Sequence, residues 1–174
     1  MPEFSVENGD CAPFHLAYIR LVESQDLSAF LPAQQVRFSN MISNIPEDRG
    51  NEAYAPGKWT IKQVLQHVID TERIFAYRLL ALCRGEQQPI PGFEQDDYMA
   101  AVDVSGRSLD DQCREFDSVR SATITLMESL RPQDLQHRGT ISESPVLAAA
   151  LPYVLAGHVE HHIGVLISKY RLSG

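Results

Sequence analysis

Residues 60–85 read TIKQVLQHVIDTERIFAYRLLALCRG, and they carry the clearest helix signals in the chain. Thr60 can accept a hydrogen bond at a helix start, and Gln63, three residues later, completes a capping box. Gly85 suits the position just after a helix end. The apolar residues between them recur at steps of three and four, which is typical of a helix with one wide buried face: Ile61, Val64, Leu65, Val68, Ile69, Phe75, Leu79 and Leu82. The stretch therefore predicts a long amphipathic helix.

Two further segments on either side have the same periodicity. The pattern is helical from His15 to Ile45, and Pro32 falls near the start of its main part, where a missing N–H is tolerated. Ser108 opens a later helix as its N-cap, and the aspartates that follow it favour the positive end of that helix. Arg131-Pro132 is expected to end it.

The last helix is predicted to begin at Ser144-Pro145, as N-cap and first position, and to run to about Tyr170. Pro152 lies inside this pattern. It should either kink the helix or mark the place where its regular part begins. We find no β-hairpin signal and no internal repeat.

The connection from Glu86 to Arg107 is too long for a structureless loop in a compact domain, so we expect a short helical piece over Glu94–Val102. The four long helices predict an all-α four-helix bundle with one long crossover connection. We expect residues 1–26 to form a leader with a short helical segment, and residues 27–174 to form a single bundle domain.

Composition and charge exclude several classes of protein. The 174 residues carry a formal net charge of −8 without a basic run, which disfavours nucleic acid and anionic lipid as partners. The apolar stretch 145–157 is too short to span a membrane. Cys11, Cys83 and Cys113 show no CxxC spacing and are predicted to be reduced thiols in or beside the core. We therefore expect a cytoplasmic protein.

Three of the six histidines lie within five residues, in the sequence GHVEHH at 157–162. His158 and His162 are four residues apart on the predicted helix, so both imidazoles can reach one ion. His158 and His161, three residues apart, form a second possible pair. His161 and His162 point about 100° apart, so one helix is not expected to offer all three to one ion.

His67 is the candidate third ligand, because it lies beside the apolar face of the helix that residues 60–85 predict. Three histidines leave one position open on a tetrahedral ion, which is the pattern of catalytic sites. The alternative is that His67 is a hydrogen-bonded core residue and that no metal is bound. His15 and His137 are predicted to lie on the surface.

Three separated stretches resemble the DinB-like superfamily and, more narrowly, its YfiT-type metal-dependent hydrolases. Residues 56–78, PGKWTIKQVLQHVIDTERIFAYR, resemble the second helix of that family. Arg84-Gly85 followed by Pro91–Asp96 resembles its connection, and AGHVEHHIGVL at 156–166 resembles its closing helix. The resemblance implies an up-down-down-up bundle and often a homodimer.

The resemblance also implies a divalent metal ion, zinc or nickel, held by His67, His158 and His162, and it favours His162 over His161. Under this reading the protein is a metal-dependent hydrolase that uses an activated water. Asp70, three residues after His67, is the candidate general base or a support for His67. The alternatives are a metal-dependent transferase that uses a low-molecular-weight thiol and a non-catalytic, stress-associated metal-binding dimer. The charged residues Glu72, Arg73 and Arg78 are predicted to form an ion-pair network flanking the bundle.

Overall fold

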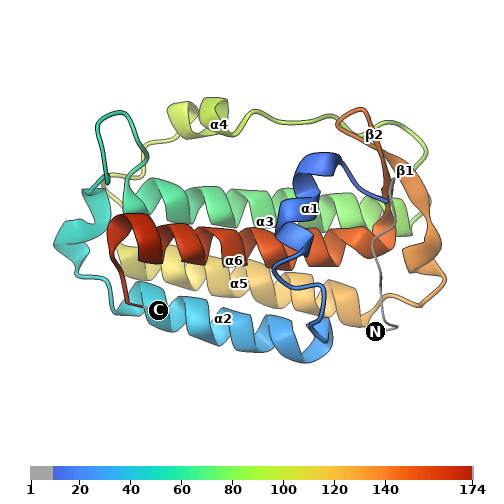
Figure 1. The fold of residues 1–174 in the computed structure, drawn as a ribbon, viewed down its shortest axis with the longest axis horizontal. Helices are drawn as coiled ribbons and strands as arrows, with labels where there is room; N and C mark the ends of the chain where they lie inside the picture. Colours follow the sequence, from blue (N-terminus) through green and yellow to red (C-terminus); the bar gives the residue numbers. More distant parts are fainter. Residues whose placement is uncertain (1–9, 174) are drawn as a thin grey trace.

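The computed structural model describes residues 10–173, and four long helices lie side by side in it (Figure 1). Along the chain, α2 and α6 run in one direction while α3 and α5 run in the other, so the predicted four-helix bundle with up-down-down-up topology is confirmed (Figure 1). The bundle helices are α2 (Leu27–Ser43), α3 (Ile61–Cys83), α5 (Leu109–Glu128) and α6 (Leu151–Tyr170). The smaller elements are α1 (Leu16–Ile19), α4 (Gln95–Ala101), the strands β1 (Arg138–Ile141) and β2 (Ser144–Leu147), and four short 3₁₀ turns.

Helix α3 packs against both α5 and α6, and α2 closes the bundle on the opposite side against the same two helices. Because α3 and α5 are parallel neighbours, the chain must return along the bundle between them, and residues 84–108 do so (Figure 1). This crossover contains α4, which confirms the short helix predicted over 94–102. The crossover thus passes over one face of α3.

The ends of α3 lie where its sequence placed them. The Thr60 hydroxyl accepts a hydrogen bond from the Gln63 N–H at 3.2 Å, and the Gln63 side chain accepts one from the Thr60 N–H at 2.8 Å. Gly85 follows the last turn with a φ of 84°, a conformation that only glycine adopts without strain. Both signals are local, which is why they were readable from the sequence.

The interior of the bundle is apolar, and buried side chains from each long helix fill it, such as Phe38, Leu65, Phe116 and Val159. The three cysteines are buried free thiols, as predicted. Among the helices of residues 10–173, none is both long and apolar enough to cross a membrane.

One ion pair crosses this apolar interior. Arg120 of α5 donates two hydrogen bonds to the Glu72 carboxylate of α3, at 2.8 and 2.9 Å, and both side chains are almost completely buried. Arg120 also donates to the Gln34 carbonyl oxygen at 2.6 Å, and the Gln34 amide donates to the backbone carbonyl of Ala156 at 2.9 Å. The chain of contacts therefore joins α2, α3, α5 and α6.

The start of the last helix was predicted wrongly. Ser144 and Pro145 belong to β2, which pairs with β1 in an antiparallel hairpin, and α6 begins only at Leu151. Pro152 occupies the first turn of α6, so it marks the beginning of the regular helix, one of the two roles considered for it. The hairpin turn, Ser142-Glu143, has positive φ at both residues, 49° and 63°. Such turns usually carry Asn-Gly or Asp-Gly, so this one left no hairpin signal.

The N-terminal segment packs onto the bundle. The helical pattern predicted from His15 to Ile45 is broken at residues 20–26, which separates α1 from α2. Ile19 and Val22 are each only 1% exposed, and α1 lies against α6. The domain limits at residues 26 and 27 stay a prediction.

We expect Gly157→Ala to displace α1 from α6 and to destabilise the protein by about 1–3 kcal/mol. A methyl group at Gly157 would lie 2.0 Å from the Tyr18 carbonyl oxygen, and a backbone atom cannot move aside alone. Faster hydrogen exchange or proteolysis over residues 10–26 would reveal the displacement. Gly164→Ala in the same helix meets nothing within 4 Å and should stabilise by about 0.5–1 kcal/mol. Equal behaviour of the two variants would contradict this packing.

Candidate metal centre

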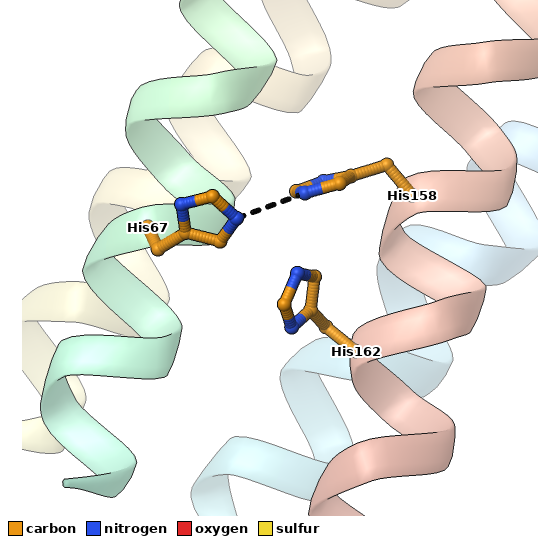
Figure 2. Close-up of side chains that lie close together, drawn as sticks. All are labelled: His67, His158 and His162. Carbon is orange, nitrogen blue, oxygen red and sulfur yellow. Dashed lines mark hydrogen bonds between the residues drawn. The ribbon is translucent and has the colours of Figure 1, made fainter. Parts of the chain in front are cut away.

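Three histidine side chains from two neighbouring helices point toward one another across the bundle (Figure 2). His67 comes from α3, and His158 and His162 come from α6. One nitrogen of each ring lies within 4.8 Å of one nitrogen of each of the others. The Nε2 atoms of His67 and His158 are 3.0 Å apart. We call these three residues the histidine cluster.

The helix geometry explains which histidines meet. His158 and His162 occupy the same face of α6, four residues apart, and the antiparallel helix α3 brings His67 opposite them. His161 is exposed, and its ring lies 5.4 Å from that of Tyr18. The structure thus groups His162, and not His161, with His158.

Burial keeps the imidazoles neutral. It lowers the pKa of His67 to about 4, with a smaller contribution from His161. Burial, followed by the neighbouring histidines, also lowers the pKa of His158 and of His162 well below the usual value. Neutral imidazole is the form that binds a metal ion, so the cluster is in its ligating state at pH 7.

The donor set fits a divalent metal ion. Two imidazole nitrogens bound to one tetrahedral ion at 2.0–2.1 Å lie about 3.3 Å apart, close to the observed separation of the His67 and His158 nitrogens. His162 Nδ1 is buried and has no hydrogen-bond partner among the residues that the structure describes. The Thr71 hydroxyl lies 3.4 Å from Nδ1 of His67, the ring nitrogen that does not face the cluster. No carboxylate or thiol of residues 10–173 joins the cluster. Three protein ligands would therefore leave one coordination position of a tetrahedral ion open to water or substrate.

Two cavities open beside the cluster. The first, of about 340 Å³, is lined by His67 and His158, and we call it the Arg78 cavity after the cation that also lines it. The second, of about 330 Å³, is lined by His162, Trp59 and Tyr170. Gln95 at the start of α4 lines both cavities, so the crossover connection contributes to the wall of each.

Two residues of the Arg78 cavity were misjudged from the sequence. His15 was predicted to lie on the surface, but only 4% of it is exposed, because α1 packs on α6 and its ring lies 5.7 Å from that of Phe75. Arg78 was assigned to an ion-pair network with Glu72, yet Glu72 pairs with Arg120 and Arg78 faces the cavity. Neither position carries a local signal, since both depend on contacts between separate elements. His137 is exposed, as predicted.

Asp70 lies apart from both cavities. Its carboxylate accepts a hydrogen bond from the Gln66 amide at 3.0 Å and lies 3.7 Å from Arg73 on the same helix. Burial raises the pKa of Asp70, partly offset by Gln66 and Arg73. A role of Asp70 in catalysis or in support of His67 stays a prediction. Glu160 interacts with Gln34 and Arg37, on the side of α6 away from the cluster.

Two proteins with similar sequences are named as metal-dependent hydrolases. A protein of Bacillus mycoides named "Putative metal-dependent hydrolase" is 28% identical over 129 residues, which cover 73% of each chain. A protein of Oceanobacillus iheyensis with the same description is 22% identical over 133 residues, again 73% of each chain.

Solved structures share the fold. YfiT from Bacillus subtilis, described as a probable metal-dependent hydrolase with an unusual four-helix bundle topology, superposes with a TM-score of 0.72 at 14% identity, over 97% of this chain and 93% of its own. A mycothiol-dependent maleylpyruvate isomerase gives 0.66 at 13% identity, over 83% of this chain and 61% of its own. The model of the DinB superfamily matches residues 31–166, most of the sequence. The chain therefore belongs to the DinB superfamily.

Proposed function

We propose that the protein is a metal-dependent hydrolase whose divalent ion, zinc or nickel, is held by His67, His158 and His162. The observation that carries this proposal is the convergence of three buried imidazoles, with nitrogens within 4.8 Å, in the lining of two cavities. When bound, the ion supplies Lewis acidity, which makes a water nucleophilic at neutral pH and polarises a substrate carbonyl.

The surrounding residues have separate roles in this proposal. Thr71 accepts the Nδ1 proton of His67 and so leaves Nε2 free to bind the ion. Phe75 and Trp59, whose rings lie 5.9 Å from His158 and 4.9 Å from His67, limit the access of bulk water. Glu94 lines the Arg78 cavity, and we assign proton transfer to it rather than to Asp70, which lines neither cavity.

Metal content tests the ligand set directly. Untagged wild-type protein is expected to contain about one zinc or nickel ion per chain, and His158→Ala is expected to contain none, because two imidazoles hold an ion much less tightly. His161→Ala is the matched control, since His161 lies three residues along the same helix but is exposed outside the cluster. Elemental analysis before and after incubation with each metal measures the result. A wild-type protein that takes up no metal would refute the proposal.

Activity is tested with aryl esters and amides of short acids. Hydrolysis is expected without any added thiol, and it should disappear on chelation and return with zinc or nickel. Metal uptake without hydrolysis of any ester or amide would leave two alternatives, a transferase that uses a small thiol and a non-catalytic metal-binding dimer.

A second candidate function is transfer of a low-molecular-weight thiol. The observation that favours it is the buried arginine in the cavity beside His67, since such a residue suits the polar half of a small thiol cofactor. The ion would then keep the thiolate deprotonated at neutral pH. A reaction that requires added glutathione or cysteine, with no hydrolysis in its absence, would support this function over hydrolysis.

We further propose that the protein is a cytoplasmic homodimer. Three free buried thiols suit a reducing compartment. Tyr77 and Leu80 expose 59% and 39% of their surface on α3 and supply apolar area for a second copy. Light scattering in solution measures the molar mass that decides this point.

A further inference from the structure

Two residues that line one cavity each carry a buried polar atom without a hydrogen-bond partner among residues 10–173. His15 Nδ1 and Arg78 Nε find no hydrogen-bond partner within the described part of the chain, and the two residues are only 4% and 3% exposed. Both line the Arg78 cavity, and so do His67 and His158. Buried polar atoms are nearly always hydrogen-bonded, so two such residues in one lining point to a site for a polar ligand.

Arg78 is a buried cation without a buried anion. Its guanidinium donates one hydrogen bond to the Pro91 carbonyl at 3.1 Å and lies between the rings of Phe75 and Phe93, at 5.6 and 5.7 Å from their centres. Across residues 10–173 no carboxylate forms an ion pair with it, whereas the equally buried Arg120 has a bidentate carboxylate partner. A desolvated guanidinium is strongly stabilised by a planar anion that can accept two of its hydrogen bonds.

The cavity joins this cation to the histidine cluster. His67, Thr71, Phe75 and Arg78 follow one another along the same face of α3, and all four line the cavity. Eleven residues of helix separate the α-carbons of His67 and Arg78 by roughly 16 Å. Side chains lean toward the helix N-terminus, and the long side chain of Arg78 reaches back to the ring of Phe75, which brings the guanidinium nearer to the cluster. A small molecule in this cavity can therefore reach both ends.

We propose that Arg78, assisted by His15, binds the carboxylate of a small organic acid whose reacting group lies several bonds away at the histidine cluster. Under the proposed function, on which this assignment of substrate class rests, the substrates are esters, amides or thiol adducts that carry a free carboxylate. Arg78 is then a specificity-determining residue, because a neutral analogue leaves its guanidinium buried and unpaired.

The charge of the cavity favours a carboxylate over a phosphate. Arg78 carries one positive charge, and burial together with Arg78 lowers the pKa of His15 to about 4, so His15 is neutral at pH 7. Glu94 adds a negative charge to the lining. Glu94 already offsets part of the charge of Arg78, so a carboxylate adds less unbalanced negative charge to this cavity than a phosphate dianion does.

The test is binding of butyrate to chelator-treated protein, followed by NMR titration of the backbone amides and of the arginine Nε–H signals. Butyrate is expected to bind wild type, and Arg78→Met is expected to weaken binding at least about 30-fold. Arg78→Lys, which keeps the charge but loses the planar fork, should lie between them and serves if the Met variant fails to fold. Arg84→Met, which removes an exposed arginine of the same helix end, should match wild type.

The controls test the carboxylate site independently of the proposed hydrolase function. Butyrate binding that depends on Arg78 and persists in His158→Ala would support it even if no metal is ever found. Binding unaffected by Arg78→Met, or equal binding of butanamide, would overturn it, as would butyrate binding seen only in metal-loaded protein. Tighter binding of inorganic phosphate than of butyrate would overturn the assignment to carboxylic acids.

Discussion

Glu72→Ala is expected to lower the free energy of unfolding by about 3–5 kcal/mol, a large part of the stability of a domain of this size. The substitution leaves Arg120 charged, desolvated and without its two charge-assisted hydrogen bonds, in a position where none of its side chain is exposed. Its remaining polar partner, the Gln34 carbonyl oxygen, is neutral and cannot replace the carboxylate. Because the same contacts join all four bundle helices, the loss should be global.

Urea unfolding followed by circular dichroism measures this effect. Glu52→Ala is the matched control, because Glu52 pairs with Arg49 on the surface and should contribute less than about 1 kcal/mol. The double variant Glu72→Met/Arg120→Met should lose less stability than Glu72→Ala, since it leaves no unpaired charge. A single variant as stable as the double one would show that water reaches Arg120, contrary to its complete burial.

The parts of the fold that were predictable depend on local chemistry. A capping box at Thr60, a glycine at 85 and an apolar face between them specify α3 without reference to the rest of the chain. The same holds for the start of α5 at Ser108, whose side chain accepts a hydrogen bond from the Asp111 N–H. The formation of these helices and the positions of their ends depend on hydrogen bonds between residues close in sequence, so sequence patterns predict both.

The hairpin was not predictable because tertiary contacts hold it. Its turn residues, Ser142 and Glu143, adopt positive φ although neither is glycine or asparagine. Ile90 of the crossover pairs with this strand, donating to the Thr140 carbonyl at 2.9 Å and accepting from the Ser142 N–H at 3.0 Å. Contacts fifty residues apart thus stabilise a turn that the local sequence does not favour.

The candidate site likewise has a part that local sequence predicts and a part that depends on tertiary contacts. The i, i+4 spacing of His158 and His162 follows from helix geometry, although spacing alone left His161 as an alternative partner. The burial of His15 depends on the packing of α1 against Gly157. Arg78 lacks a carboxylate partner within residues 10–173 because Glu72 forms its ion pair with Arg120. Cavities form where separate elements meet, so their lining is the part of a site that one sequence reveals least.

Acidification from pH 7.5 to pH 5 is expected to destabilise the protein strongly. Burial holds the folded-state pKa of His15 and of His67 at about 4, whereas both take up a proton near pH 6.5 when unfolded. Because the unfolded state binds these protons first, stability is complete above pH 6.5 and is lost as the pH falls toward 4. At pH 5 the loss is about 2 kcal/mol for each of the two residues. His158 and His162 act in the same direction.

Metal release should accompany this unfolding rather than precede it, because protons compete for His67 within the folded protein only near pH 4. Urea unfolding at several pH values, with and without chelator, measures the stability, and a metal indicator read alongside circular dichroism measures the release. His137→Gln, which removes an exposed histidine, should leave the pH dependence unchanged, whereas His15→Gln should reduce it. Release at pH 6 with the helical signal intact would contradict the prediction, since it would mean that the cluster titrates as solvent-exposed imidazoles do.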